Sequence, residues 1–255
     1  MKIMTYNLLN GAVDQFNEVI QVVNTEKPDF LTLNEANGFD VDNNKRLLEF
    51  ASKTHFPYHR LAICGDGDSY HVAVFSRLPF KSVNTISPFA RAAIVAIVDT
   101  PTGEIVFIGT HLTPYTEDLR IPEAKMIIET LKNYPKSIVM GDLNSLSPSD
   151  GYDEAMVNGF NDMQIKKFTT QGKLRYDVMN LFLENGFIDT AVLFGKQRII
   201  TAPTSLNEYE AHTNMRLDYI LTSGSLKDRV KTYDVIQNGL TDKSSDHYPV
   251  AITLG

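Results

Sequence analysis

The chain has 255 residues, enough for one large domain or two small ones, and 43% of them are hydrophobic, which allows a substantial core. Its net charge of −7 means that a nucleic-acid ligand would need a local basic surface. The single cysteine, Cys64, excludes an internal disulfide and a cysteine-only zinc site. With no apolar run near the roughly 20 residues of a membrane span and no signal-peptide pattern, we expect a cytoplasmic protein.

Short apolar runs alternate with amphipathic segments in the first half of the chain. The apolar positions from Phe16 to Val23 recur at helical spacing, with Asp14 suited to the cap and Pro28 ending the helix. A second helix is predicted over residues 42–52. Strands are predicted at residues 2–6, 30–33, 59–63, 71–75, 92–98 and 105–109.

Turn residues divide the rest of the chain into further elements. Thr102-Gly103 lies between the last two of those strands and predicts an antiparallel hairpin. Helical spacing over residues 124–131 predicts a helix, with Pro122 in its first turn, where a missing N–H does little harm. A long irregular region, residues 144–204, contains one predicted helix that begins at Tyr176 and stops at Gly186. The remaining strands are expected at residues 137–140, 217–221 and 249–253.

The chain is predicted to form a single domain over residues 1–255, because it has no internal repeat, low-complexity tract or long linker. Helices and many strands in mixed order predict an α/β architecture of two sheets covered by helices. Nothing in the sequence indicates an obligate protein partner.

Polar residues that can bind a metal follow or adjoin six of the apolar runs. They are Asn7, Glu35, His111, Asp142 with Asn144, Asp218, and the pair Asp246-His247. Because strand ends on one edge of a sheet converge, we expect these side chains to share one pocket. Convergent carboxylates repel one another unless a cation or a proton offsets their charge. Oxygen ligands of this kind suit Mg²⁺ or Mn²⁺ rather than zinc, so the pattern predicts a hard-metal site.

Each of these residues also has an ordinary structural explanation. An asparagine after a strand can form an Asx-turn, a glutamate at a strand end is usually solvated, and a lone histidine is more often part of a core. The aspartates could cap turns or pair with a nearby arginine such as Arg216 or Arg229. These explanations are independent and all of them would have to hold together, so we favour a shared site.

Six short motifs carry the polar residues. They are Thr5-Tyr6-Asn7, Leu33-Asn34-Glu35, Gly109-Thr110-His111-Leu112, Gly141-Asp142-Leu143-Asn144, Arg216-Leu217-Asp218-Tyr219-Ile220 and Ser245-Asp246-His247. In this order, and across nearly the whole chain, they resemble the endonuclease/exonuclease/phosphatase superfamily, the group with the DNase I-like fold. The resemblance implies a four-layered α/β sandwich, in which two mixed, largely antiparallel sheets pack face to face with helices outside. It also implies a metal-dependent hydrolase of phosphate esters.

The resemblance implies a role for each acidic and amide residue of the motifs. Glu35 would be the principal metal ligand, with Asn7 and Asp246 completing or supporting the shell around Mg²⁺ or Mn²⁺. Asp142 would orient or deprotonate the attacking water. Asn144 would donate a hydrogen bond beside the scissile phosphorus.

The resemblance likewise implies roles for the histidines. His247 would contact the phosphoryl oxygens, while Asp218 would orient its ring and favour the cation. His111 would contact the phosphate or give a proton to the leaving group. His71 lies near the place where relatives have a site-lining residue, so it is a candidate substrate-binding residue.

Two positions depart from patterns found in the family. Some members have an acidic residue where this chain has Leu9, and members that act on abasic DNA often have a tyrosine where it has His111. The histidine form is typical of the DNase, sphingomyelinase and general bacterial branches.

Three substrate classes are left open: nucleic acid, a small phosphate ester or diester such as a nucleotide or sugar phosphate, and a lipid headgroup. The support for nucleic acid is a basic cluster with interleaved aromatic residues, which we interpret instead as a solvated loop. Its members are Lys166, Lys167, Phe168, Lys173, Arg175 and Tyr176. Lipid ranks lowest because no apolar insertion segment is evident. A non-catalytic binding scaffold would be expected to lack Glu35, Asp142 or His247, and all three are present.

Overall fold

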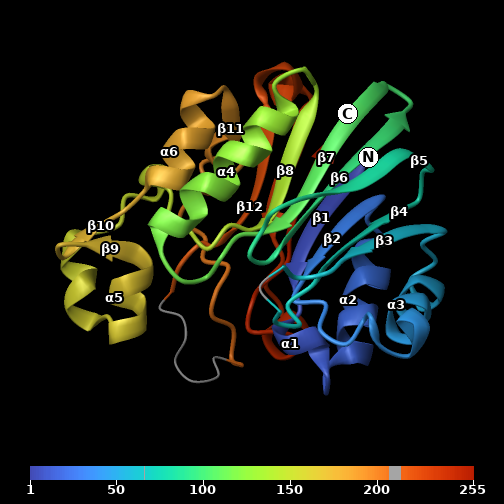
Figure 1. The fold of residues 1–255 in the computed structure, drawn as a ribbon, viewed down its shortest axis with the longest axis horizontal. Helices are drawn as coiled ribbons and strands as arrows, with labels where there is room; N and C mark the ends of the chain where they lie inside the picture. Colours follow the sequence, from blue (N-terminus) through green and yellow to red (C-terminus); the bar gives the residue numbers. More distant parts are fainter. Residues whose placement is uncertain (66, 207–213) are drawn as a thin grey trace.

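The computed structural model describes residues 1–65, 67–206 and 214–255, and the strands of this part form two six-stranded sheets and a two-stranded ribbon (Figure 1). The first sheet contains β1 (Lys2–Asn7), β2 (Phe30–Asn34), β3 (Tyr58–Ala62), β4 (Val72–Ser76), β13 (Val230–Val235) and β14 (Val250–Leu254). The second contains β5 (Phe80–Ile86), β6 (Ala92–Thr100), β7 (Gly103–His111), β8 (Ser137–Asp142), β11 (Phe187–Asp189) and β12 (Asp218–Ser223). The ribbon pairs β9 (Thr169–Thr170) with β10 (Lys173–Leu174).

Both sheets are mixed and largely antiparallel. Their strand orders are β13-β14-β1-β2-β4-β3 and β11-β12-β8-β7-β6-β5. Within the described residues, β1 with β2 and β7 with β8 are the parallel pairs. The predicted hairpin is confirmed, because β6 and β7 pair antiparallel with Thr100 opposite Gly103.

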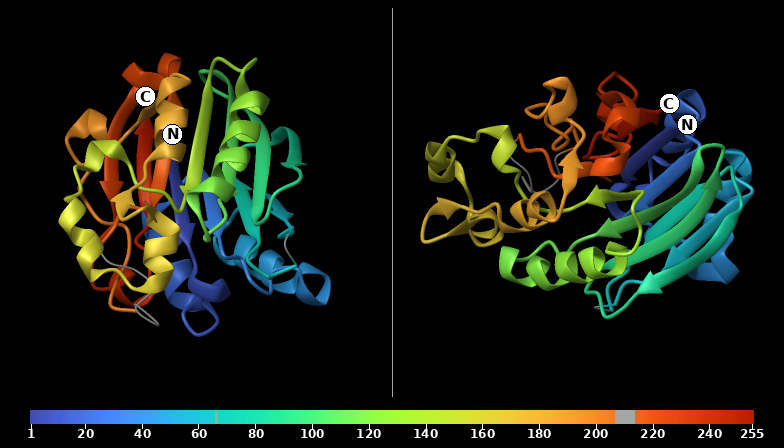
Figure 2. Two further views of the ribbon diagram at one scale, coloured as in Figure 1. Left: turned by 60° about the vertical axis from the view of Figure 1, so that its left-hand side comes forward. Right: turned by 90° about the horizontal axis from the view of Figure 1, so that it is seen from above.

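The two sheets pack face to face (Figure 2). A core of buried apolar side chains from both sheets fills the space between them. Phe30 of β2 stacks on Phe107 of β7, with ring centroids 4.0 Å apart. Gly109 marks a close approach of the sheets, since a Cβ there would lie 2.7 Å from both Thr32 Oγ1 and Val74 Cγ1. These contacts explain why a glycine occupies the middle of a strand.

Helices cover the outer faces of both sheets. α2 (Phe16–Glu26) and α3 (Val41–Lys53) pack on the first sheet, and α4 (Glu117–Leu131) and α6 (Asp177–Glu184) on the second. The fold is therefore the predicted four-layered α/β sandwich. Two smaller helices, α1 (Leu9–Ala12) and α5 (Asp162–Phe168), lie nearer the ends of the strands (Figure 1). Short 3₁₀ helices occupy Pro148–Asp150, Glu154–Gly159, Val192–Phe194, Gly224–Arg229 and Thr241–Lys243. In the described part of the chain, no helix has the length and apolar character needed to cross a bilayer.

The structure corrects two predicted helix starts. Pro122 is not in the first turn of its helix, because α4 begins at Glu117, five residues earlier. The proline stands on the exposed side of the second turn, where it interrupts one hydrogen bond of the helix without adding a ring to the core. Asp14 does not cap α2, which begins at Phe16 after Gln15 and has no side-chain cap.

Candidate active site

The chain brings the predicted site residues to one edge of the sandwich through strand register. Asn7 and Asn34 end β1 and β2 side by side. Asp142, the last residue of β8, lies opposite both His111 of β7 and Asp218 of β12. Since β14 runs antiparallel to β1, the segment that precedes it delivers Asp246 and His247 to the same edge.

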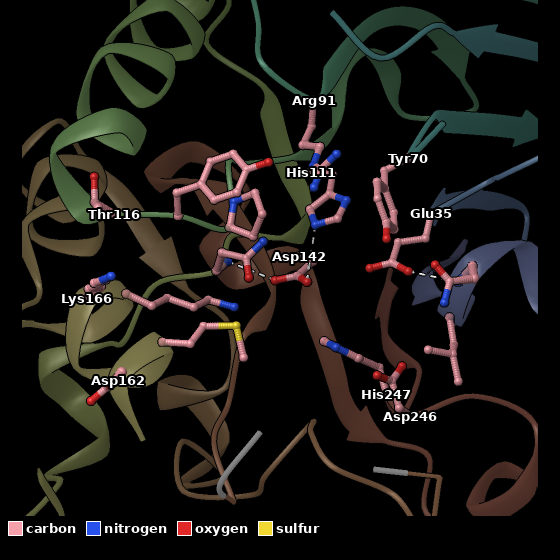
Figure 3. A pocket seen from close by; sticks show the side chains of 17 residues that line it. Glu35, Tyr70, Arg91, His111, Thr116, Asp142, Asp162, Lys166, Asp246 and His247 are labelled. Carbon is pink, nitrogen blue, oxygen red and sulfur yellow. Dashed lines mark hydrogen bonds and ion pairs between the residues drawn. The ribbon is translucent and has the colours of Figure 1, made fainter. Parts of the chain in front are cut away.

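A pocket of about 640 Å³ opens at this edge (Figure 3). Six of the predicted site residues line it: Glu35, His111, Asp142, Asn144, Asp246 and His247. Asn7 and Asp218 are buried behind the wall and contact residues that do line it.

Asn34 connects the two sheets directly beneath this pocket. Its Nδ2 donates to the carbonyl oxygen of Thr110 at 2.7 Å, and its Oδ1 accepts from the backbone N–H of Asp142 at 3.0 Å. The amide therefore fixes the ends of β7 and β8 relative to β2. The sequence motif contained this residue, but only its hydrogen bonds in the structure show that it positions the strand ends that carry His111 and Asp142.

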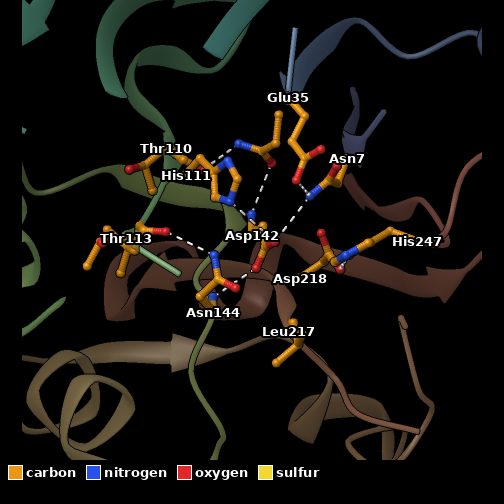
Figure 4. Close-up of polar contacts among 12 residues, drawn as sticks. Asn7, Glu35, Thr110, His111, Thr113, Asp142, Asn144, Leu217, Asp218 and His247 are labelled. Carbon is orange, nitrogen blue, oxygen red and sulfur yellow. Dashed lines mark hydrogen bonds and ion pairs between the residues drawn. The ribbon is translucent and has the colours of Figure 1, made fainter. Parts of the chain in front are cut away.

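Asn7 holds two carboxylates of the site at once (Figure 4). Its Nδ2 donates to Glu35 Oε1 at 3.3 Å and to Asp142 Oδ2 at 3.2 Å, while its Oδ1 accepts from the N–H of Leu9. Glu35 also accepts from the backbone N–H of Asn10 at 2.9 Å and has a positive φ of 55°. A positive φ is uncommon outside glycine. The contacts of the carboxylate therefore help to hold the Glu35 backbone in a conformation that the isolated chain disfavours.

Asp142 is buried and surrounded by donors. Asn144 donates from its backbone N–H to Asp142 Oδ1 at 2.8 Å, and one Nδ2 proton of Asn144 goes to the carbonyl of Leu112 at 2.9 Å. The second Nδ2 proton of Asn144 is left for the pocket. Burial would raise the pKa of Asp142, but His111, His247 and Lys167 outweigh it and lower that pKa, so the carboxylate is ionised at neutral pH.

His247 and Asp218 form a buried pair. His247 Nδ1 lies 2.7 Å from Asp218 Oδ2, and both side chains are at most 2% exposed. Thr201 Oγ1 accepts from the backbone N–H of Asp218 at 3.1 Å. Burial alone would lower the pKa of His247, but the charges of Asp218 and Asp246 outweigh it and raise that pKa to about 10. The ring is therefore an imidazolium at neutral pH.

The second histidine, His111, is in the opposite protonation state and is neutral at neutral pH. Burial lowers the pKa of His111 to about 4, although the charge of Asp142 opposes this. Within the described residues, neither ring nitrogen has a hydrogen-bond partner, and Nε2 lies 3.6 Å from Asp142 Oδ2. A buried imidazole without a partner at the wall of a pocket is placed to bind a ligand.

The structure does not bring His71 to the pocket wall. Its Nδ1 accepts from the backbone N–H of Cys64 at 3.1 Å, and its Nε2 lies 3.2 Å from Asp40. The preceding residue, Tyr70, lines the pocket instead. His71 was predicted from its place near a site-lining residue of relatives, which does not determine the direction of the side chain.

The donor atoms at the pocket fit a hard divalent cation. Glu35 and Asp246 both line it, and burial together with the charge of Asp246 raises the pKa of Glu35 to about 7. A cation would remove that repulsion, and carboxylate oxygens suit Mg²⁺ or Mn²⁺.

A second group of possible ligand atoms lies nearby. Atoms of Asp142, Asp218 and His247 lie within 4.8 Å of one another. His247 Nδ1 is engaged by Asp218 and the ring is protonated, so it has no lone pair there for a metal. Glu35 and Asp246 are therefore the carboxylates of the pocket that could hold a cation.

Several residues line the pocket that sequence reasoning did not assign to it. Lys166 and Lys167 belong to α5 and line the pocket. Their interpretation as part of a solvated loop is wrong for Lys167, because its side chain is only 7% exposed. Lys173 is exposed, as predicted, and Arg175 pairs with Asp118 and Asp177. Arg91, Tyr70 and Tyr115 line the pocket as well, and the Arg91 guanidinium lies 4.1 Å from the Tyr70 ring centroid.

A two-sheet sandwich with carboxylates, amides and two histidines at one edge defines the class of DNase I-like phosphoesterases. The model of the endonuclease/exonuclease/phosphatase family matches residues 4–247, and the chain belongs to this family. Its members are hydrolases that act on phosphoesters. No curated protein sequence matches the chain.

Solved structures with the same fold include an AP endonuclease from Archaeoglobus fulgidus, with a TM-score of 0.75, 19% identity, and coverage of 100% of this chain and 99% of that one. An endonuclease/exonuclease/phosphatase family protein from Leptotrichia buccalis has a TM-score of 0.70, 19% identity and coverage of 100% and 99%. The 3′ phosphatase NExo from Neisseria, bound to a product DNA hairpin, has a TM-score of 0.71, 17% identity and the same coverage.

Proposed function

We propose that this protein hydrolyses phosphodiesters by attack of water on phosphorus, with Mg²⁺ or Mn²⁺ as its cofactor. The observation that carries the proposal is that Glu35, Asp142, Asp246 and His247 line one pocket. Glu35 and Asp246 would hold the cation, and Asn7 would orient Glu35. When bound, such a cation neutralises phosphate oxygens and supports the extra charge of the transition state.

The remaining residues act directly on water and phosphate. Ionised Asp142 orients the attacking water and accepts its proton. The His247 imidazolium donates to phosphoryl oxygens, and Asp218 keeps its ring charged and oriented. Asn144 supplies an amide N–H. Neutral His111 supplies one N–H, so it is a hydrogen-bonding contact rather than a strong acid.

Nucleic acid is the polymeric substrate with most support. Lys166 and Lys167 bring cationic side chains to the pocket, as does Arg91, which pairs with Asp68. Acidic residues line the same pocket, so the support comes from these cations together with the aromatic faces of Tyr70 and Tyr115. One of the similar structures, the 3′ phosphatase NExo, is bound to a product DNA hairpin, and another is an AP endonuclease. A small phosphodiester would use the same catalytic groups.

Hydrolysis of bis(p-nitrophenyl) phosphate tests the proposal. Activity should require Mg²⁺ or Mn²⁺ and disappear in chelator. The Asp142→Asn variant keeps the shape of the side chain and removes the base, so turnover should fall by roughly 10²- to 10⁴-fold. A DNA duplex, a single strand and a lipid headgroup diester assayed in parallel would identify the substrate class.

The exposed Asp228→Asn variant is the matched control and should keep full turnover. Undiminished hydrolysis in chelator would refute the metal assignment. Normal turnover in a folded Asp142→Asn protein would refute the role given to that carboxylate.

A further inference from the structure

Lys167 is a lysine that the fold has buried with its ammonium facing the catalytic pocket. It is 7% exposed and lines the pocket beside Asp142. Lysine is almost never this buried without a partner, because removing an ammonium from water is costly. Its Nζ lies 5.1 Å from the centroid of the Phe168 ring, a cation–π contact, and among the residues that the structure describes none accepts a hydrogen bond from it or forms an ion pair with it. The charge of the side chain is therefore available to something that enters the pocket.

The backbone of Lys167 is held firmly in this place. Arg120, which is fully buried, donates from Nη2 to the carbonyl oxygen of Lys167 at 2.6 Å and from Nη1 to that of Thr113 at 3.1 Å. At the other end of α5, Asn161 and Gln164 form a capping box. The helix is thus fixed to the loop that follows His111, and its last turn is fixed relative to the site.

The charges around Lys167 indicate which class of ligand the pocket would bind. The lysine lies within electrostatic range of three carboxylates, those of Asp142, Glu35 and Asp246. It is therefore on the same side of the site as these carboxylates. His247 and Lys167 are two cations that both act on Asp142. An anion bound over Asp142 would lie within electrostatic range of both cations. The anion that the proposed reaction brings there is a phosphate.

We propose that Lys167 binds nonbridging oxygens of the reacting phosphate, as a substrate-binding residue in addition to the groups that the motifs identify. This inference rests on the proposed function, because it gives the lysine the same phosphate that Asp142 and His247 act upon. Lys166, the adjacent residue, is exposed and lies at the rim, so the two lysines have different roles.

Lys167→Met tests this, since methionine preserves the apolar stem and removes the charge. Binding of inorganic phosphate, measured by calorimetry in Mg²⁺, should weaken roughly 10- to 100-fold, the range of a lost charge-assisted hydrogen bond. In the bis(p-nitrophenyl) phosphate assay, kcat/KM should fall by a similar factor. Lys167→Arg retains the charge and should stay within about threefold of the wild type in both measurements.

Lys173→Met, at an exposed lysine of the neighbouring ribbon, is the matched control and should change neither quantity. The inference is overturned if folded Lys167→Met binds phosphate within twofold of the wild type, or if Lys173→Met loses as much. Melting temperatures establish folding, and Lys167→Gln replaces the methionine variant should that one not fold. If the wild type binds phosphate but hydrolyses no diester, the proposed function fails, while the binding comparison still tests Lys167.

Discussion

Asp218 is completely buried and does not line the pocket, yet it controls the state of the histidine that does. Its carboxylate lies 2.7 Å from His247 Nδ1 and, with Asp246, raises the pKa of that ring to about 10. A carboxylate behind a catalytic histidine fixes both the protonation and the direction of the ring. His247 therefore depends on a residue that never contacts the substrate.

Asp218→Asn should reduce turnover by roughly 10²- to 10⁴-fold, because it retains the shape and removes the charge that keeps His247 cationic. An NMR titration should show the pKa of His247 below its wild-type value of about 10. The NMR titrations of the variant and the wild type are recorded with the same fraction of each protein bound to phosphate. Unchanged turnover together with a lowered histidine pKa would show that the imidazolium is not needed.

The sequence predicted single residues well where a strand ends in a polar group. Asp142 and His111 terminate their strands, so the strand pairing alone brings them together. Lys167 and His71 were misjudged for a different reason. The environment of each depends on side-chain direction and on how a distant segment packs, and neither is contained in local spacing.

At the scale of secondary structure, one buried ion pair connects three helices to the site. Glu117, in the first turn of α4, accepts from Arg120 Nε at 3.1 Å and Nη2 at 2.9 Å. The same carboxylate accepts from Ser145 Oγ and from the backbone N–H of Val178 in α6, each at 2.8 Å. Arg120 in turn holds the carbonyl of Lys167 in α5. The pair thus arranges α4, α5 and α6 around the loop that follows Asn144.

Glu117→Gln should destabilise the protein by about 3–5 kcal/mol, because it leaves the buried Arg120 guanidinium without its counter-charge. Urea unfolding measures the loss. Asp118→Asn is the matched control one residue along: its side chain is 76% exposed and pairs with Arg175 at the surface, so we expect a change within about 1 kcal/mol. Equal stability of the two variants would mean that the buried pair is dispensable.

The elements that sequence patterns missed are short or lie at sheet edges. β5 and β13 are edge strands in which most side chains are at least partly exposed, so apolar alternation is weak there. α5 has seven residues, and β11 has three. Such elements are stabilised by tertiary contacts more than by their own propensity. The long central strands, by contrast, were predicted within two residues at each end.

At the scale of the whole molecule, the mixed order of helices and strands predicted two sheets covered by helices, and the six motifs, through the family resemblance, predicted the four-layered sandwich. Local patterns indicate that strands exist, but the pairing of β1 with β14 joins residues that are about 250 positions apart in sequence. Such pairings depend on global packing. The motifs contained this information because residues such as Asn34 and Gly109 have the identities that the contact between the sheets requires.

The contact between the sheets at Gly109 leads to the last prediction. A Cβ on this residue would lie 2.7 Å from Thr32 Oγ1, 2.7 Å from Val74 Cγ1 and 2.9 Å from Thr32 Cγ2, all in the opposite sheet. Gly109→Ala should therefore force the sheets apart and cost about 1–3 kcal/mol of unfolding free energy. Because His111 follows two residues later on β7, kcat for the diester should fall as well.

Gly239→Ala is the matched control, since a Cβ there would meet nothing within 4 Å and the backbone does not have a positive φ. This exposed substitution should be neutral or slightly stabilising, by up to about 1 kcal/mol, because alanine restricts the unfolded chain. Urea unfolding and diester hydrolysis of both variants give the comparison. If Gly109→Ala proved as stable and as active as Gly239→Ala, the sheets would have room to separate, and their close approach could not be what places His111 and Asp142 against Glu35, which follows β2 of the opposite sheet.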